Sequence, residues 1–203
     1  NFKDARLEGD KWRSLPDAEH VRDFFRILGV CHTVIPEGEA TRETICYQAE
    51  SPDESAFVVA AKRFGFFFKS RTTSGMELEE PSYHSSGEIS TVDYELLNVL
   101  EFNSTRKRMS VIVRTPEDKI MLYCKGADSV IYDRLSHGNQ KYTDVTQQHM
   151  DEYAKCGLRT LCLSVREISQ SEYDAWNVTY TEAAQSLEKR DEKLQAAAEI
   201  IEK

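Results

Sequence analysis

Three strand-like segments follow one another closely in the middle of this sequence, and they constrain the fold more than any other feature. Residues 94–102 and 119–124 are rich in apolar side chains, and in 108–114 apolar residues alternate with polar ones. Asn and Ser follow the first segment, and Pro, Glu and Asp separate the second from the third. Because connections this short can join only antiparallel neighbours, the pattern predicts an antiparallel meander.

Helical patterns stand on both sides of this meander. Before it, apolar residues recur at helical spacing in 14–29, where Gly29 is expected to cap the helix end. After it, Asp128 is expected to cap a short helix that runs to Leu135. Further segments are predicted as strands at 45–49, 66–69 and 158–166, as a helix at 143–154, and as largely helical at 169–203.

A second amphipathic helix is predicted to begin directly after Ser51. Ser51 is a natural N-cap, Pro52 suits the first helical position, and Glu54 stands three residues after the cap, as in a capping box. Gly65 is expected to end this helix in a left-handed conformation.

The segment 72–91 has a different composition from its neighbours. It is rich in Ser, Thr, Gly and Glu and has few apolar residues, so we expect a surface loop that can hold an irregular hairpin. Helices that bracket a largely antiparallel sheet predict an α+β fold.

Composition and missing motifs exclude several functions. A formal net charge of −9 argues against general binding to nucleic acid or to anionic lipid. No apolar run approaches the roughly 20 residues of a membrane helix, so we expect the chain to be soluble. The five cysteines form no Cys-x-x-Cys pair and are interpreted as reduced core thiols. Neither common glycine-rich phosphate loop is present, and no His-Glu-x-x-His sequence supports a catalytic metal.

Two local features combine an ordinary structural explanation with a chemical one. Glu54 fits a helix start, but a carboxylate there can also accept a hydrogen bond from a ligand amine such as that of adenine. Phe102 precedes a polar turn with three consecutive cations, Arg106 to Arg108, which is typical of a solvated hairpin tip. The same ring can stack on a purine, and the cations can attract phosphates.

Two further features lie later in the chain. Lys125-Gly126-Ala127-Asp128 suits a tight strand-to-helix turn, and it also permits a planar ligand to approach the backbone beside an ammonium group. Arg159, in Cys-Gly-Leu-Arg-Thr-Leu, fits a strand surface as well as it fits a site in which a guanidinium grips a phosphate.

Taken in order, the motifs Ser-Pro-Asp-Glu, Glu-Phe-Asn-Ser-Thr-Arg-Lys-Arg-Met-Ser, Lys-Gly-Ala-Asp and Gly-Leu-Arg-Thr-Leu resemble the nucleotide-binding domain of type IV P-type ATPases, the phospholipid flippases. The resemblance spans at least residues 50–165, and it departs mildly from the family pattern at Ser55 and Phe57. It implies a single nucleotide-binding domain over 1–203, in which 187–203 forms a helical lead into a hinge.

The resemblance also implies roles for individual residues. Glu54 would contact the adenine, Phe102 would stack on it, and Lys125 would close the other side of the pocket. Arg159 would reach toward the phosphates, while Ser104 and Arg106 are weaker candidates for the same cofactor-binding site.

At the level of the whole protein, the resemblance implies a cytosolic domain at the face of a membrane. Such a domain binds ATP as Mg-ATP, with the magnesium held mainly by a separate phosphorylation domain, and presents the γ-phosphate to a catalytic Asp of that domain to drive lipid flipping. The implied partners are the phosphorylation and actuator domains of the same polypeptide and a membrane-anchored accessory subunit, with no nucleic acid. This sequence contains no Asp-Lys-Thr-Gly, so we expect no catalytic residue and no turnover in this chain alone.

Two alternatives remain open at this stage. The chain is also compatible with the nucleotide domain of a cation-transporting P-type ATPase. The second alternative is a non-catalytic interaction module, which would use the 72–91 segment and the acidic surface to bind a protein partner.

Overall fold

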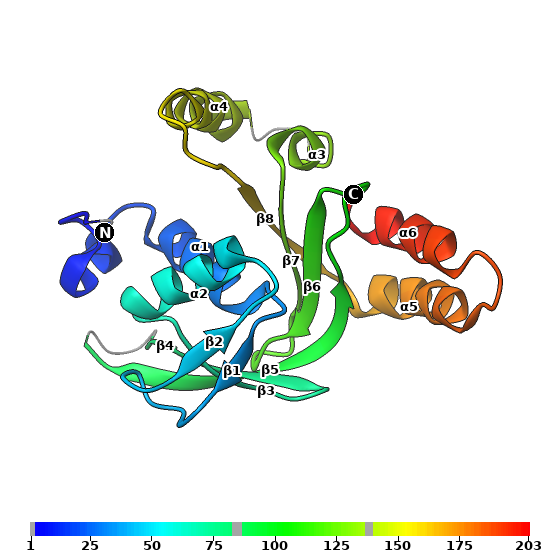
Figure 1. Cartoon of the computed structure of the whole chain (residues 1–203), viewed down its shortest axis with the longest axis horizontal. Coiled ribbons are helices and arrows are strands. Elements are labelled where there is room, and N and C mark those ends of the chain that lie inside the picture. The colour runs from blue at the N-terminus through cyan, green and yellow to red at the C-terminus, as the bar shows by residue number, and fades with distance from the viewer. Residues whose placement is uncertain (1–2, 83–86, 137–139) are drawn as a thin grey trace. The chain divides into compact units, whose positions relative to one another are not determined.

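The fold was obtained as a computed structural model, which describes residues 3–82, 87–136 and 140–203 (Figure 1). The largest element is a six-stranded sheet with the strand order β3-β4-β5-β6-β7-β8. Its strands are β3 (Phe67–Arg71), β4 (Gly75–Pro81), β5 (Ile89–Leu100), β6 (Arg108–Arg114), β7 (Ile120–Gly126) and β8 (Cys162–Ile168). Strands that follow one another in sequence are neighbours in the sheet, so the predicted meander and the α+β class are confirmed.

Internal contacts divide the chain into two compact units. Unit 1 comprises Asn1–Leu97 and Val113–Asp118, and unit 2 comprises Asn98–Ile112 and Lys119–Lys203. The single domain expected over 1–203 stays a prediction.

Unit 1 is built around two helices that pack against each other, α1 (Ala18–Val30) and α2 (Pro52–Arg63). It also holds the 3-10 helix η1 (Glu8–Ser14) and a two-stranded sheet of β1 (Ile35–Glu37) and β2 (Cys46–Gln48). Phe25 of α1 stacks on Phe66 with ring centroids 5.8 Å apart, and both rings are buried. Burial of aromatic side chains of this size supplies much of a core's stability.

The prediction that Gly29 ends the first helix is wrong. Gly29 lies inside α1, and a Cβ atom added there would lie 3.1 Å from Leu78 Cδ1 of β4. The glycine therefore serves a close approach between α1 and the sheet.

The prediction of a surface loop at 72–91 is wrong for the residues that form strands, but the hairpin expected within this segment is confirmed. β4 pairs with β5 in an antiparallel register from Gly75 opposite Glu95 to Pro81 opposite Ile89. Met76 and Leu78 are buried, and Glu80 is buried as well because it forms an ion pair of 2.9 Å with Arg26. Residues 83–86 of the predicted loop lie outside the described residues.

In unit 2, the chain forms helices α3 (Asp128–Tyr132) and α4 (Gln140–Lys155) after β7 and before β8 in sequence. The helical segment predicted at 169–203 is two helices, α5 (Gln170–Gln185) and α6 (Arg190–Ile201), separated near Lys189, which has a left-handed φ of 51°. The two helices pack together, and the buried Trp176 ring of α5 donates a hydrogen bond of 2.8 Å to the carbonyl oxygen of Ala197 in α6.

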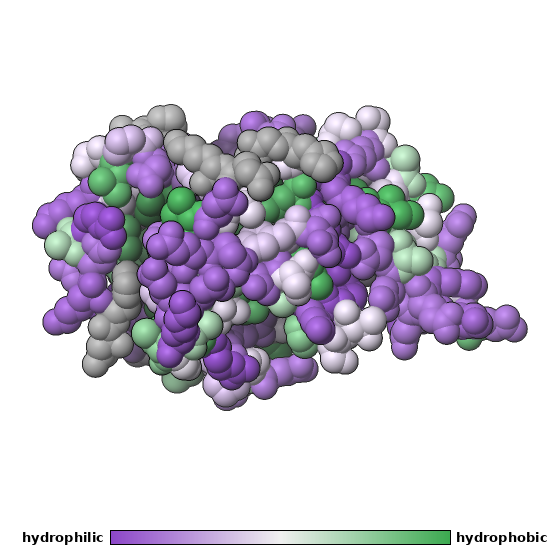
Figure 2. All heavy atoms as spheres, turned by 90° about the horizontal axis from the view of Figure 1, so that it is seen from above, coloured by the Kyte–Doolittle hydropathy of each residue, from purple (hydrophilic) through white to green (hydrophobic). Residues whose placement is uncertain are grey.

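The surface agrees with the charged composition. Hydrophilic side chains cover most of the face drawn in Figure 2, with small apolar patches between them. In the described part of the chain, no helix is both long enough and apolar enough to cross a bilayer. Three of the cysteines are buried thiols as predicted, but Cys46 and Cys156 are exposed, so the interpretation of all five as core residues is wrong for these two.

Candidate functional site

Phe102 lies at the start of the turn that connects β5 to β6, and 64% of its surface is exposed. The side chain of Asn103 shapes this turn, because its Oδ1 accepts hydrogen bonds from the amides of Thr105 (3.1 Å) and Arg106 (2.7 Å). The amide of Lys107 donates to the Asn103 carbonyl oxygen at 2.9 Å, and Lys107 has a positive φ of 53°. An Asn side chain that binds the following amides is a common way to fix a tight turn.

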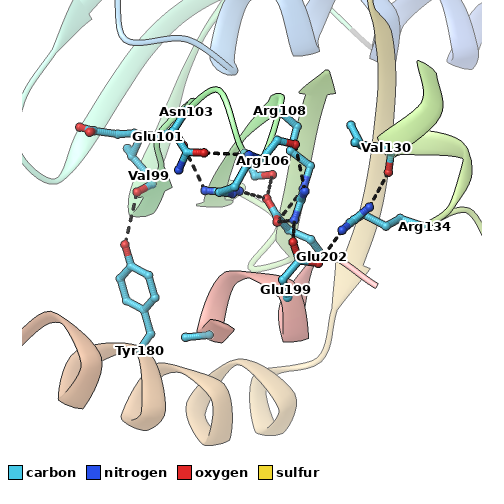
Figure 3. A network of polar contacts seen from close by, with 12 residues as sticks. Val99, Glu101, Asn103, Arg106, Arg108, Val130, Arg134, Tyr180, Glu199 and Glu202 are labelled. Atoms are coloured by element: carbon cyan, nitrogen blue, oxygen red, sulfur yellow. Dashed lines mark hydrogen bonds and ion pairs between the residues drawn. The ribbon is translucent and has the colours of Figure 1, made fainter. Parts of the chain in front are cut away.

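The cations of this turn differ in exposure. Arg106 and Arg108 are buried, with 5% and 1% of their surface exposed, whereas Lys107 and Ser104 are exposed. The Arg106 guanidinium donates to the carbonyl oxygen of Glu101 at 3.0 Å and pairs with Glu202 (Figure 3). The binding role predicted for Arg106 stays a prediction; its contacts assign it to holding the turn.

Arg108 lies between two carboxylates at the end of α6. Its Nη2 atom is 2.7 Å from Glu199 Oε1 and 2.6 Å from Glu202 Oε2 (Figure 3). Burial alone would lower the pKa of Arg108, but the hydrogen bonds that it donates to these carboxylates, together with their negative charges, raise it above its ordinary value. The side chain is therefore a charged, fully engaged structural group.

The Lys125 motif lies directly beside this turn. The Ala127 amide donates a hydrogen bond of 3.0 Å to the carbonyl oxygen of Lys107. At Gly126, an added Cβ atom would lie 2.5 Å from Arg108 Cβ, so only glycine allows the two backbones to approach this closely. Lys125, which precedes it, is buried.

The Arg159 motif is brought to the same region by the pairing of β7 with β8. Gly126 lies opposite Cys162, the first residue of β8, and Lys125 lies opposite Leu163. Arg159 precedes β8 by three residues and is exposed, so it lies in a loop and not on the strand predicted at 158–166. Within unit 2, the Phe102 turn thus adjoins the Lys125 motif, and the Arg159 motif leads into the strand that pairs with the Lys125 motif.

Glu54 belongs to unit 1, and its carboxylate binds Thr33. One oxygen accepts from the Thr33 amide at 3.1 Å and the other from the Thr33 hydroxyl at 3.0 Å. Ser51 is the N-cap of α2 as predicted, but it accepts from the Asp53 amide, and Glu54 does not complete a capping box. Whether Glu54 joins the residues of unit 2 stays a prediction.

Two cavities are lined by other residues of the chain. One of about 800 Å³ is lined mostly by apolar side chains of α1 and α2, and one of about 410 Å³ is lined by β7, β8, α3 and the residues after α6. Neither is lined by any of the predicted site residues. In 3–82, 87–136 and 140–203, no group of three or more His, Cys, Asp or Glu is placed to hold a metal ion.

Most of the chain matches a known family model. Residues 20–201 match the model described as P-type ATPase, cytoplasmic domain N, and the chain belongs to this family. Membership implies that the chain is a nucleotide-binding domain and binds ATP.

Individual relatives indicate which branch of the family the chain resembles most. The chain is 47% identical over 194 residues to Phospholipid-transporting ATPase 10 of Arabidopsis thaliana, covering 96% of this chain and 16% of the relative. It is 48% identical over 189 residues to Phospholipid-transporting ATPase DRS2 of Saccharomyces cerevisiae, covering 92% of this chain and 13% of the relative. The chain therefore spans about one sixth or less of the length of these relatives, and its similarity lies with phospholipid-transporting members.

Glu199 and Glu202 were not found by sequence reasoning. They stand in a charged helical segment whose composition resembles any solvated helix, and they lie 65 to 96 residues away from the arginines that they bind. These ion pairs could be predicted only from the fold, because nothing in the local sequence marks either glutamate as an ion-pair partner.

Proposed function

We propose that unit 2 binds the adenine of ATP with the exposed face of Phe102, beside the Lys125-Gly126-Ala127 backbone. The observation that carries this proposal is the hydrogen bond from Ala127 to Lys107, which sets the stacking ring and the lysine motif on adjoining backbones. Stacking of a base on an aromatic ring contributes about 1–3 kcal/mol, so an exposed phenylalanine on a fixed turn is an effective platform.

The fit of ATP rests on the chemistry of the residues present. Gly126 leaves no side chain between its backbone and that of Lys107, and Lys125 supplies a positive charge next to it. The exposed Arg159 reaches the phosphates as a bidentate donor in this proposal. Exposed Ser104 and the buried Arg106 act on the same site, Ser104 as a polar neighbour of the ring and Arg106 by holding the turn.

Glu54 accepts a hydrogen bond from the exocyclic amine of the adenine in this proposal. The two hydrogen bonds from Thr33 orient this carboxylate, whose oxygens act only as acceptors when it is ionised. The Thr33 contacts thus support a pre-oriented acceptor.

For the protein to which the domain contributes, we propose ATP-driven phospholipid transport, in keeping with the printed names of the relatives. The domain presents the γ-phosphate to an Asp of a separate phosphorylation domain, and the magnesium of Mg-ATP is held mainly there. The phosphorylation and actuator domains and a membrane-anchored accessory subunit are the proposed partners, at the cytosolic face of a membrane. The chain alone does not turn over ATP in this proposal.

The test is a titration of the chain with ATP, followed residue by residue by amide chemical shifts. We expect saturable shifts in 101–108 and 125–128. Phe102→Ala should weaken binding by about tenfold, which corresponds to 1.4 kcal/mol of lost stacking. Lys125→Met, which keeps the aliphatic stem and removes the charge, should weaken it as well.

Tyr153→Ala removes another exposed aromatic side chain of unit 2 and serves as the matched control. It should bind ATP like the unaltered chain. Equal affinities for Phe102→Ala and Tyr153→Ala would reject the proposed site, and an absence of any saturable shift would reject ATP binding by this chain.

A further inference from the structure

A buried charge cluster connects the end of α6 to the turn that carries Phe102 (Figure 3). Glu202, which follows α6, has only 6% of its surface exposed. Its Oε2 accepts from Arg108 Nε at 2.9 Å and from Arg108 Nη2 at 2.6 Å. Its Oε1 accepts from Arg106 Nη2 and from the buried hydroxyl of Ser110. The carboxylate is thus satisfied on both oxygens by groups of β6 and of the turn before it.

Within this cluster, Glu202 and Glu199 have different partners. Glu199 pairs with Arg108 and with Arg134, and no hydrogen bond or ion pair joins it to Arg106. Arg106 has one carboxylate partner, Glu202, among the residues that the structure describes. Loss of the Glu202 charge would therefore leave a buried guanidinium with the carbonyl oxygen of Glu101 as its remaining acceptor.

The contacts of Arg106 extend to both sides of the turn. Its guanidinium donates to the carbonyl oxygen of Glu101, the residue directly before Phe102, and its amide donates to the Asn103 side chain directly after Phe102. The Phe102 ring itself is largely exposed, so the backbone on either side determines where it points. A group that fixes Arg106 therefore fixes the direction of the ring.

We propose that Glu202 is a positioning residue for nucleotide binding, which holds the Phe102 turn in its binding conformation through Arg106 and couples it to the end of α6. This inference rests on the proposed function, because it assumes that Phe102 stacks on the nucleotide. Coupling between two positions is reciprocal, so a nucleotide on Phe102 must in turn steady the end of α6. The amide of Glu202, which donates to the Ala198 carbonyl oxygen at 3.2 Å, reports on that end.

The experiment compares Glu202→Gln with Glu199→Gln by ATP titration, under conditions in which circular dichroism shows both variants folded. Glu202→Gln should weaken ATP binding about fivefold or more and shift the amide signals of 101–107 before ATP is added. Glu199→Gln, which removes a carboxylate from the same cluster without touching Arg106, should keep the affinity within about twofold. Equal affinities for Glu202→Gln and the unaltered chain would overturn the inference, as would equal losses in both variants.

A second measurement tests the coupling without any substitution at Glu202, so it does not depend on whether such a variant folds. In the unaltered chain, saturating ATP should slow hydrogen exchange of the Glu202 amide, and in Phe102→Ala the same ATP concentration should not. Unchanged exchange in the unaltered chain, at ATP concentrations that shift the amides of 101–108, would overturn the coupling while leaving the proposed function standing. Absence of ATP binding by the unaltered chain would instead reject the proposed function, and the inference with it.

Discussion

The amide of Ala127 donates a hydrogen bond of 3.0 Å to the carbonyl oxygen of Lys107, and this contact joins two sequence motifs that lie about twenty residues apart. Lys107 can point its carbonyl this way because it adopts a positive φ of 53°, a conformation that few residues other than glycine occupy. The contact also requires a glycine at position 126, where the two backbones come closest.

Gly126→Ala should destabilise the chain by about 1–3 kcal/mol, since the new Cβ atom would lie 2.8 Å from the Lys107 carbonyl oxygen and 2.5 Å from Arg108 Cβ. Urea denaturation measures the effect. The control is Gly75→Ala, where the nearest atom to an added Cβ is 3.5 Å away, and it should change the free energy of unfolding by less than about 1 kcal/mol. Equal stability of both variants would show that the turn can retreat from β7 without cost.

Thiol labelling should divide the cysteines into two groups, with two thiols that react fast and three that react slowly. Cys46 and Cys156 are exposed, whereas Cys31, Cys124 and Cys162 are buried. Burial raises the pKa of the Cys124 thiol to about 11, so almost none of it is the reactive thiolate at pH 8. Maleimide labelling followed by mass spectrometry of peptides is the measurement, with labelling in denaturant as the control. Fast labelling of Cys124 in the folded chain would contradict the structure around β7.

The stability of unit 2 should depend on acid through Glu199. Partial burial raises the pKa of this carboxyl, but the hydrogen bonds from Arg108 and Arg134 outweigh it, and the net pKa lies below the ordinary value of 4.5. A carboxyl with a lowered folded pKa contributes stability above the unfolded pKa, and this contribution is lost as the pH falls through the folded pKa.

Glu199→Gln should therefore lower the free energy of unfolding by about 1.5 kcal/mol at pH 7, and the difference should shrink steadily below about pH 4.5. Thermal unfolding from pH 7 to pH 3 measures this. Glu192→Gln, on the same helix but in an exposed pair with Lys189, should follow the unaltered chain throughout. A constant difference between Glu199→Gln and the unaltered chain at every pH would show that the loss is one of packing and not of charge.

Local signals in the sequence predicted the parts of the fold that depend on neighbouring residues. The alternation of Met109, Val111 and Val113 placed β6, and the predicted bounds 108–114 agree with the structure. Gly65 ends the second helix with a φ of 99°, as its position after the apolar pattern indicated. Both features are decided within a few residues of chain.

Interactions between distant residues could not be predicted in the same way. β4 looks like a polar loop because its Glu80 is charged, and Glu80 is buried only because Arg26, 54 residues earlier, neutralises it. The candidate site likewise combines features set by local sequence with features set by distant residues. The turn around Phe102 is fixed by Asn103 and was visible in the sequence, but the burial of Arg106 depends on Glu202, 96 residues away.

The Glu202 cluster also decides where this domain can be cut for expression on its own. The family match ends at residue 201, one position before the carboxylate that neutralises Arg106 and Arg108. A chain shortened to that boundary would retain the whole sheet and all of α6, yet two buried guanidinium groups would lose their shared counter-ion. Its instability would then stem from a single missing carboxylate, even though every helix and strand is present.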